Sequence, residues 1–369
     1  MSPSIEEQIK EIEDEIFNTQ KNKATEHHIG KLKAKIARLR EDLQKQKSSG
    51  AKGKGFAIKK AGDATVGIIG FPSVGKSTLL NVLTRASSKI GDYDFTTLEV
   101  IPGILQYSGA DIQVLDLPGL IIGASRGRGR GKEILSAIRN VDLALLLVDV
   151  YDVEKIPAIL QELYDAGIRL NQVMPDVVIT KKGMGGILVN STVPQSMLSE
   201  KTIRSIASEF VINAQITLRE DLTESRLIDA FSENRLYVKA MIAINKIDVF
   251  PEKQIKDIVS KIENQGWCVV PISARKKTGI EQLKQSLFSQ LELIRIYMKP
   301  VGKSTDFEQP LILQRGNTVE DACRKLHREF LKKFRYAIVT GPSAKHPSQK
   351  IGLDHQLKDT DVLTIVVSR

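Results

Sequence analysis

The most constraining feature of this sequence is the glycine-rich run GFPSVGKST at residues 70–78. It fits the pattern G-x-x-x-x-G-K-[ST] and follows an apolar stretch, residues 64–69, that is typical of a buried strand. Backbone N–H groups in such a loop converge on phosphate oxygens. The sequence therefore predicts an α/β domain with a loop that binds the phosphates of a nucleoside triphosphate.

A second motif specifies the base. Asn245-Lys246-Ile247-Asp248 follows another apolar segment, residues 237–244. The carboxylate of Asp248 can accept hydrogen bonds from N1–H and the exocyclic amine of guanine, whereas adenine offers neither donor there. The predicted ligand pair is GTP and GDP.

Three further segments occur in the chain order of a GTPase switch domain. Residues 116–119, DLPG, follow the predicted strand 112–115, and Ser273-Ala274 follow the predicted strand 268–272, where they would lie against guanine O6. Between the phosphate loop and Asp116, the segment Phe95-Thr96-Thr97 offers a hydroxyl for Mg²⁺. Thr97 is favoured over Thr96 for that role.

These motifs assign roles to individual residues. Lys76, Thr97 and Gly119 are the predicted catalytic residues around the γ-phosphate, and the predicted Mg²⁺ ligands are Ser77, Thr97 and Asp116. The predicted nucleotide contacts are Phe71, Pro72, Ser73, Val74, Gly75, Lys76, Ser77, Thr78, Asp116, Leu117, Pro118, Gly119, Leu120, Asn245, Lys246, Ile247, Asp248, Ser273 and Ala274.

GFPSVGKST, YDFTTL-x-x-IPG and DLPGLIIGA together resemble the Obg branch of GTPases. With the following SRGRGRG, the sequence is most similar to the developmentally regulated GTP-binding proteins (the DRG/Rbg family, in particular the yeast Rbg type), over essentially the whole chain. The resemblance implies GTP hydrolysis coupled to work on ribosomes in cytoplasmic translation. It also implies a DRG-family regulatory protein as partner, with this chain a monomer within a heterodimer.

Activation of the attacking water is the step for which the motifs name no residue. Ras-like GTPases place a glutamine where this chain has Leu120, which has no polar group. Arg126, Arg128 or Arg130 could approach the γ-phosphate, or an external activator could supply the group. Some relatives without the glutamine use K⁺ held by an asparagine. This chain has Ser73 there, which leaves a K⁺ site bound by backbone carbonyls as an open alternative.

The length of 369 residues and changes in pattern predict several domains. Residues 61–166 and 236–290 are predicted to form the P-loop GTPase domain. Residues 167–235 are too long for a connection and predict an inserted small α+β domain, which the resemblance suggests is S5 domain-2-like. Residues 291–369 show a strand, strand, helix, strand, strand order, a β-grasp pattern that matches the TGS domain of DRG proteins.

Residues 1–60 are predicted to form an N-terminal helical hairpin and a basic linker. Ser4 to Glu7 make a capping box, and a second helix has Ile29, Leu32 and Ile36 at helical spacing. The basic outer face is predicted from Lys31, Lys33, Lys35, Arg38 and Arg40, followed by a flexible segment at residues 48–55. An RNA-contacting element and a partner-binding coiled segment both fit this pattern.

The net charge of +10 is concentrated. Residues 21–60 hold 13 Lys or Arg against 3 Asp or Glu, and six more cations crowd residues 324–335. A polyanion such as ribosomal RNA fits these segments, and solvated polar faces are the alternative. The two cysteines lack metal-ligand spacing, and no stretch of about 20 apolar residues occurs, so a cytoplasmic protein without membrane contact is expected.

Two functions fit these features. One is an enzymatic switch that hydrolyses GTP, and the other is an RNA- or ribosome-binding scaffold in which GTP is mainly structural. The complete set of nucleotide and Mg²⁺ ligands favours the switch.

Overall fold

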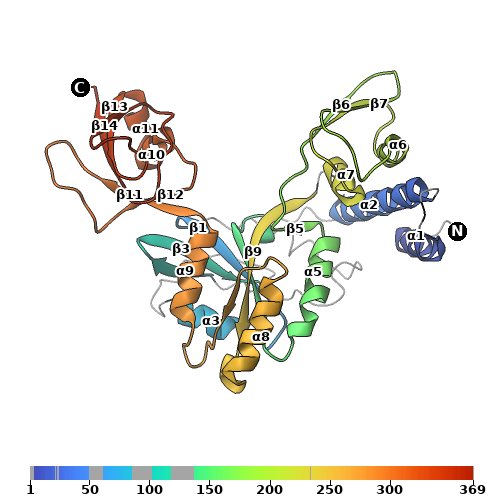
Figure 1. The fold of residues 1–369 in the computed structure, drawn as a ribbon, viewed down its shortest axis with the longest axis horizontal. Coiled ribbons are helices and arrows are strands. Elements are labelled where there is room, and N and C mark those ends of the chain that lie inside the picture. Colours follow the sequence, from blue (N-terminus) through green and yellow to red (C-terminus); the bar gives the residue numbers. More distant parts are fainter. Residues whose placement is uncertain are drawn as a thin grey trace. The chain divides into compact units, whose positions relative to one another are not determined.

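The computed structural model describes residues 4–20, 22, 25–49, 61–84, 102–117, 137–232 and 234–368 of the chain (Figure 1). These residues form two compact units. The first unit contains the N-terminal helices and Glu162–Tyr237, and the second contains the remaining described residues.

A mostly parallel sheet forms the centre of the second unit (Figure 1). The strand order is β10-β9-β4-β1-β3-β2, with β2 antiparallel at one edge and β5 (Ile168–Leu170) paired to β9. The strands are β1 (Ala64–Ile69), β2 (Pro102–Tyr107), β3 (Ala110–Asp116), β4 (Leu143–Asp149), β9 (Leu236–Asn245) and β10 (Val269–Pro271). The helices are α3 (Lys76–Leu83), η1 (Val153–Lys155), α5 (Ile156–Asp165), η2 (Ile247–Val249), α8 (Glu252–Glu263) and α9 (Ile280–Gln290). The strands predicted at residues 64–69, 112–115, 237–244 and 268–272 are confirmed as β1, β3, β9 and β10.

The core explains why these segments became strands. All seven residues of β4 are buried, as expected for a central parallel strand that is covered on both faces. Leu79 and Leu83 of α3 and Leu287 of α9 pack in one cluster with Val66 and Leu145 of the sheet. This packing fixes the carboxyl ends of the strands, from which the functional loops begin.

The C-terminal residues of the second unit form a five-stranded sheet in the order β12-β11-β15-β13-β14. Its elements are β11 (Leu293–Met298), β12 (Leu311–Gln314), α10 (Val319–Leu326), α11 (Arg328–Lys332), β13 (Phe334–Thr340), β14 (Gln349–Ile351) and β15 (Asp361–Val367). The β-grasp order is confirmed, with two differences. The predicted single helix breaks at His327, whose backbone is extended and whose side chain accepts from Glu329 N. The three-residue strand β14 was too short to show a pattern.

The first unit pairs the N-terminal helices α1 (Ile5–Asn18) and α2 (Glu26–Ser49) with a small α+β body. That body has a three-stranded sheet, β6-β8-β7, and two helices. Its elements are β6 (Val177–Lys181), β7 (Ile187–Ser191), α6 (Glu200–Ala207), β8 (Ala214–Leu218) and α7 (Glu224–Phe231). The predicted α+β character of this segment is confirmed, and its likeness to S5 domain 2 stays a prediction.

The hairpin is not the separate body that its sequence suggests. Ala34 and Ala37 of α2 belong to the same core as Ile203 and Ile206 of α6. Small residues permit this close packing, and a Cβ on Gly30 would lie 3.3 Å from Ile206. The helix α2 also runs to Ser49, so the first two residues of the predicted flexible segment are helical. Residues 50–55 lie outside the described part.

Packing against the inserted body also uses most of the predicted basic face of α2. Lys31 lies 3.6 Å from a Glu209 carboxylate oxygen, and Lys33 pairs with Glu224. Arg38 donates to the Glu209 carbonyl, and Arg40 bridges Glu13 and Asp165. Lys35 is the member of this face for which the described residues give no such contact. The cations therefore serve largely to hold the first unit together.

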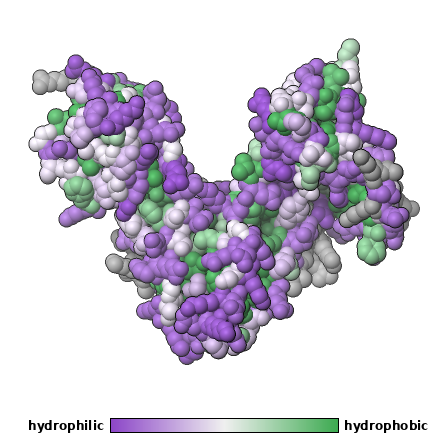
Figure 2. Space-filling view, in the orientation of Figure 1, coloured by the Kyte–Doolittle hydropathy of each residue, from purple (hydrophilic) through white to green (hydrophobic). Residues whose placement is uncertain are grey.

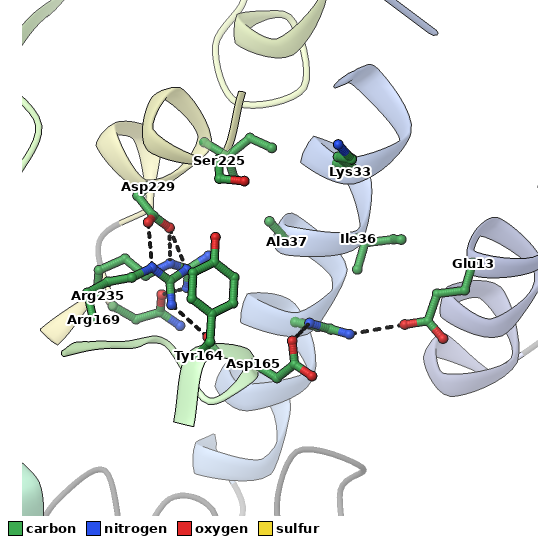
Figure 3. Close-up of a pocket in the computed structure, with 13 residues that line it drawn as sticks. Glu13, Lys33, Ile36, Ala37, Tyr164, Asp165, Arg169, Ser225, Asp229 and Arg235 are labelled. Atoms are coloured by element: carbon green, nitrogen blue, oxygen red, sulfur yellow. Dashed lines mark hydrogen bonds and ion pairs between the residues drawn. The ribbon is translucent and has the colours of Figure 1, made fainter. Parts of the chain in front are cut away.

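A cavity of about 280 Å³ in the first unit is lined by a buried ionic cluster (Figure 3). Asp229 accepts from Arg169 Nε at 2.5 Å and Nη2 at 2.7 Å, and from Arg235 Nε at 2.7 Å. The Tyr164 ring lies 3.6 Å from the Arg169 guanidinium carbon. The Arg169 and Asp229 side chains are 3% and 4% exposed. Because they satisfy each other, we interpret the cluster as a structural tie between α7, β5 and the start of β9.

No described helix is both long and apolar enough to cross a membrane. The face shown in Figure 2 is mostly hydrophilic, with apolar side chains in small groups.

Candidate nucleotide-binding site

Four predicted functional segments follow strands of one sheet. The strands β1, β3, β4, β9 and β10 are parallel, so their carboxyl ends meet at one edge. The phosphate loop follows β1, Asp116 ends β3, Asn245 ends β9 and Ser273 follows β10. A ligand at this edge would meet all of these side chains.

The phosphate loop needs its two motif glycines because other backbone and side-chain atoms approach them closely. Gly75 has φ +96°, and a Cβ there would lie 2.5 Å from Asn245 Nδ2. A Cβ on Gly70 would lie 2.3 Å from the Leu147 carbonyl oxygen. Gly75 is also the N-cap of α3 without a side-chain cap, so the first N–H groups of α3 are open to a phosphate.

Lys76, the first residue of α3, reaches back across the loop. Its ammonium donates to the carbonyls of Gly70 and Phe71, both at 3.0 Å. Burial lowers the pKa of Lys76, and the neighbouring Asp116 carboxylate opposes part of that shift. The two hydrogen bonds hold the Lys76 ammonium at the loop, where phosphate oxygens could replace the carbonyls as acceptors.

Ser77 and Asp116 lie together beside Lys76. The Ser77 hydroxyl donates to Asp116 Oδ2 at 3.2 Å. Asp116 is 6% exposed, and its Oδ1 is buried without a hydrogen-bond partner among the described residues. A hydroxyl and an unsatisfied carboxylate oxygen are the hard oxygen donors that Mg²⁺ accepts. The two residues therefore fit a magnesium site, and the third predicted ligand, Thr97, lies outside the described residues.

Asn245 connects the loops at the base end of the site. Its Nδ2 donates to the Val74 carbonyl at 2.8 Å, and its Oδ1 accepts from Ala274 N at 3.0 Å. The residue is 3% exposed. One side chain thus joins the phosphate loop, the end of β9 and the segment after β10.

Asp248 is oriented by a neighbouring hydroxyl. Ser273 Oγ donates to Asp248 Oδ1 at 2.7 Å, and Lys276 Nζ lies 3.7 Å from Asp248 Oδ2. The hydrogen bond from Ser273 is the main cause that lowers the pKa of Asp248. The carboxylate is therefore ionised at neutral pH and able to accept from a donor pair such as N1–H and N2–H of guanine.

Several predicted site residues cannot be placed. Pro118, Gly119 and Leu120 lie outside the described residues, as does Arg126 with the other predicted loop arginines. Leu117 is described and buried, and Leu117 N donates to the Ile68 carbonyl.

None of the sequence motifs includes the loop after β4. Asp149 pairs with Lys246, the Tyr151 ring packs edge-on to Phe250, and Lys155 lies 5.7 Å from the Phe71 ring centre. Since β4 lies between β1 and β9, its end must lie between the phosphate loop and residues 245–248, here called the guanine loop. The available signal was an aspartate at the end of a continuous apolar run, LALLLVD.

The phosphate loop, the serine–aspartate pair and the N-K-x-D loop at adjacent strand ends define a GTPase domain. Residues 65–181 match the family model described as a 50S ribosome-binding GTPase, and residues 184–293 match the C-terminal region of that domain. Residues 294–367 match the TGS domain.

Full-length relatives identify the family. The chain is 52% identical over 366 residues to an uncharacterised GTP-binding protein of Methanocaldococcus jannaschii, covering 99% of this chain and 93% of that protein. It is 44% identical to developmentally regulated GTP-binding protein 1 of Xenopus laevis, covering 97% and 98%. Ribosome-interacting GTPase 1 of Saccharomyces cerevisiae is also 44% identical, covering 99% and 100%. The chain belongs to the developmentally regulated GTP-binding protein family and is a GTPase.

Proposed function

We propose that this GTPase is a switch in cytoplasmic translation that binds the ribosome in a state set by its nucleotide. The observation that carries the proposal is the pairing of Ser77 with an Asp116 carboxylate that has a buried, unsatisfied oxygen. A scaffold that only needs a bound nucleotide has little use for an unsatisfied buried carboxylate, whereas a GTPase cycle uses such a group for its metal. The name of the yeast relative supports the ribosome as the partner.

In this proposal each end of the nucleotide has its own residues. Lys76 and the open N–H groups at the start of α3 bind the β- and γ-phosphates, while Asp248, oriented by Ser273, reads the guanine edge. Ser77, Asp116 and Thr97 hold Mg²⁺, which supplies positive charge to the phosphates when bound. Thr97 and Gly119 would contact the γ-phosphate, and these contacts would be lost when hydrolysis removes it.

Base recognition has a direct test. Asp248→Asn replaces the acceptor for N1–H and N2–H with an amide, so GTP affinity should fall about ten- to a hundredfold, the loss expected for a charge-assisted pair. Binding of xanthosine triphosphate should rise, because its C2 carbonyl accepts from the new amide. Unchanged GTP affinity would remove Asp248 from the site.

Leu120 gives the water-attack step no polar group, so intrinsic turnover should be slow. Leu120→Ala should change it by no more than a few fold, whereas Lys76→Ala should nearly abolish nucleotide binding or hydrolysis. The activating group then comes from the adjoining arginine-rich loop, from K⁺ or from an external activator. Assays with K⁺ replaced by Na⁺ distinguish the ion from the others.

The ribosome contact that we propose is the exposed basic surface made by Arg328, Lys332, Lys333 and Arg335. These four side chains are exposed, whereas Arg324 pairs with Glu320, and Lys325 donates to Asp63 and to the Ile312 carbonyl. Ribosomal RNA fits a surface with this concentration of positive charge. A regulatory protein of the DRG family would bind elsewhere on the chain as the second member of a heterodimer.

One set of measurements tests the switch against the scaffold. GTP turnover is measured with and without ribosomes, and cosedimentation is measured with GTP, GDP and a non-hydrolysable analogue. The switch predicts turnover that rises with ribosomes and binding that differs between GTP and GDP. Equal binding in all three nucleotides, with turnover indifferent to ribosomes, would favour the scaffold.

A further inference from the structure

The lysine of the guanine loop is held by a residue outside every recognised motif. Lys246 has φ +65°, a left-handed conformation, and its ammonium pairs with the carboxylate of Asp149. The Asp149 side chain is 9% exposed, whereas that of Lys246 is 40% exposed. The buried carboxylate of Asp149 therefore fixes the direction in which the Lys246 side chain extends from the loop.

Asp149 is itself held by strand pairing and by backbone hydrogen bonds. It is the last residue of β4 and lies in register with Asn245 of β9. Its Oδ1 accepts from Tyr151 N at 3.1 Å, and its carbonyl accepts from Asp152 N at 2.9 Å. In addition, Val150 N donates to the Asn245 carbonyl at 3.1 Å. One carboxylate oxygen is thus used by the backbone of its own loop, and the other is left for Lys246.

An unanchored lysine samples many rotamers, and ordering it when a ligand binds costs conformational entropy. A fixed counter-charge removes part of that cost before binding. We propose that Asp149 is a positioning residue that holds Lys246 ready for the guanine nucleotide. This inference rests on the proposed nucleotide site, because it assumes that Lys246 contacts the nucleotide.

The proposal separates Asp149 from the residue that reads the base. Asp248 recognises the guanine amine, so its loss changes the preference between guanine and hypoxanthine nucleotides. Lys246 has no acceptor for that amine, and its positioning should affect both nucleotides equally. Loss of Asp149 should therefore weaken GDP and inosine diphosphate by the same factor. Since Lys246 is 40% exposed, water can solvate its freed ammonium, and a buried unpaired charge does not complicate the result.

The experiment measures the dissociation constants of GDP and inosine diphosphate for the full chain carrying Asp149→Asn, Asp149→Ala, Lys246→Ala or Asp149→Ala with Lys246→Ala. We expect GDP binding to weaken about fivefold in Asp149→Asn and about tenfold in Asp149→Ala, with the ratio of the two nucleotides unchanged. The double variant should bind no more weakly than Lys246→Ala alone. Asp257→Asn, the same change at an exposed carboxylate of α8, is the matched control and should bind as wild type.

Each contrary result has a distinct meaning. If Lys246→Ala binds as wild type, the proposed role of Lys246 fails and the inference fails with it. If Lys246→Ala weakens binding but Asp149→Ala and Asp149→Asn do not, only the inference is overturned. If the double variant weakens GDP binding by the product of the two single effects, Asp149 acts independently of Lys246. That result also overturns the inference. Thermal unfolding without nucleotide checks that each variant is folded. If Asp149→Ala does not fold, the dissociation constants of Asp149→Asn test the inference.

Discussion

Asn245 offers the sharpest test of how the site is assembled. The residue is 3% exposed, and its side chain makes hydrogen bonds to the Val74 carbonyl and the Ala274 N–H. Asn245→Ala leaves both backbone groups without this partner, and each unsatisfied buried group costs about 1–3 kcal/mol. Partial entry of water reduces the total, so we expect the free energy of unfolding to fall by about 2–4 kcal/mol. GDP affinity should also fall, because the phosphate loop and the segment after β10 lose their common tie.

The informative assay is urea denaturation without nucleotide. If Asn245 served only to touch the ligand, the unfolding free energy of the nucleotide-free chain would be the same in wild type and Asn245→Ala. A loss below about 0.5 kcal/mol, the usual effect of a surface substitution, would refute the argument. Asn264→Ala, the same change at the exposed C-cap of α8, is the matched control and should stay within that limit.

Three further predictions concern packing, charge and pH. Gly75→Ala should abolish nucleotide binding in a fluorescence titration, since its Cβ would lie 2.5 Å from Asn245 Nδ2 at a φ of +96°. Asp229→Ala leaves the buried Arg169 and Arg235 without their counter-charge and should lower the unfolding free energy by about 3–5 kcal/mol in urea denaturation. Ser273→Ala should raise the pKa of Asp248. Because a depressed carboxylate pKa preserves binding above that pKa and loses it below, GDP affinity in Ser273→Ala should fall at a higher pH than in wild type as the solution is acidified.

A nucleotide site could be predicted from the sequence because its motifs are local. Gly75 and Asp248 belong to runs whose spacing is set by one loop each, and the strand before each run has a continuous apolar pattern. Such patterns can be read without knowing which strands are neighbours. The roles of individual side chains are harder to predict. The motif predicts a nucleotide contact for Asn245, and in the structure its side chain hydrogen-bonds to two backbone groups of the protein.

Features that depend on pairing between distant segments cannot be predicted from a local pattern. Asp149 is one more acidic residue until β4 is known to lie between β1 and β9. The helix break at His327 is likewise absent from the sequence pattern, because the apolar spacing from Val319 to Phe330 continues across it. Periodicity records which residues face the core, and it does not record where a backbone turns between them.

The N-terminal basic segment shows why a charge count does not by itself define a binding surface. Residues 21–60 contain 13 cations, and yet Lys31, Lys33, Arg38 and Arg40 contact acidic side chains or a carbonyl in the same unit. A cation that already has such a partner releases fewer counterions when it meets RNA, because part of its charge is neutralised beforehand.

Charge reversal should therefore have different effects at the two basic segments. Lys332→Glu with Lys333→Glu removes two exposed cations, so it should weaken ribosome binding and make the slope of log affinity against log salt less steep by about two. Lys31→Glu with Lys33→Glu places like charges against Glu209 and Glu224 and should mainly lower the melting temperature. Ribosome cosedimentation over a salt series measures the first effect, and thermal unfolding measures the second. If the slope of log affinity against log salt changes only in Lys31→Glu with Lys33→Glu, the RNA contact lies on the N-terminal segment.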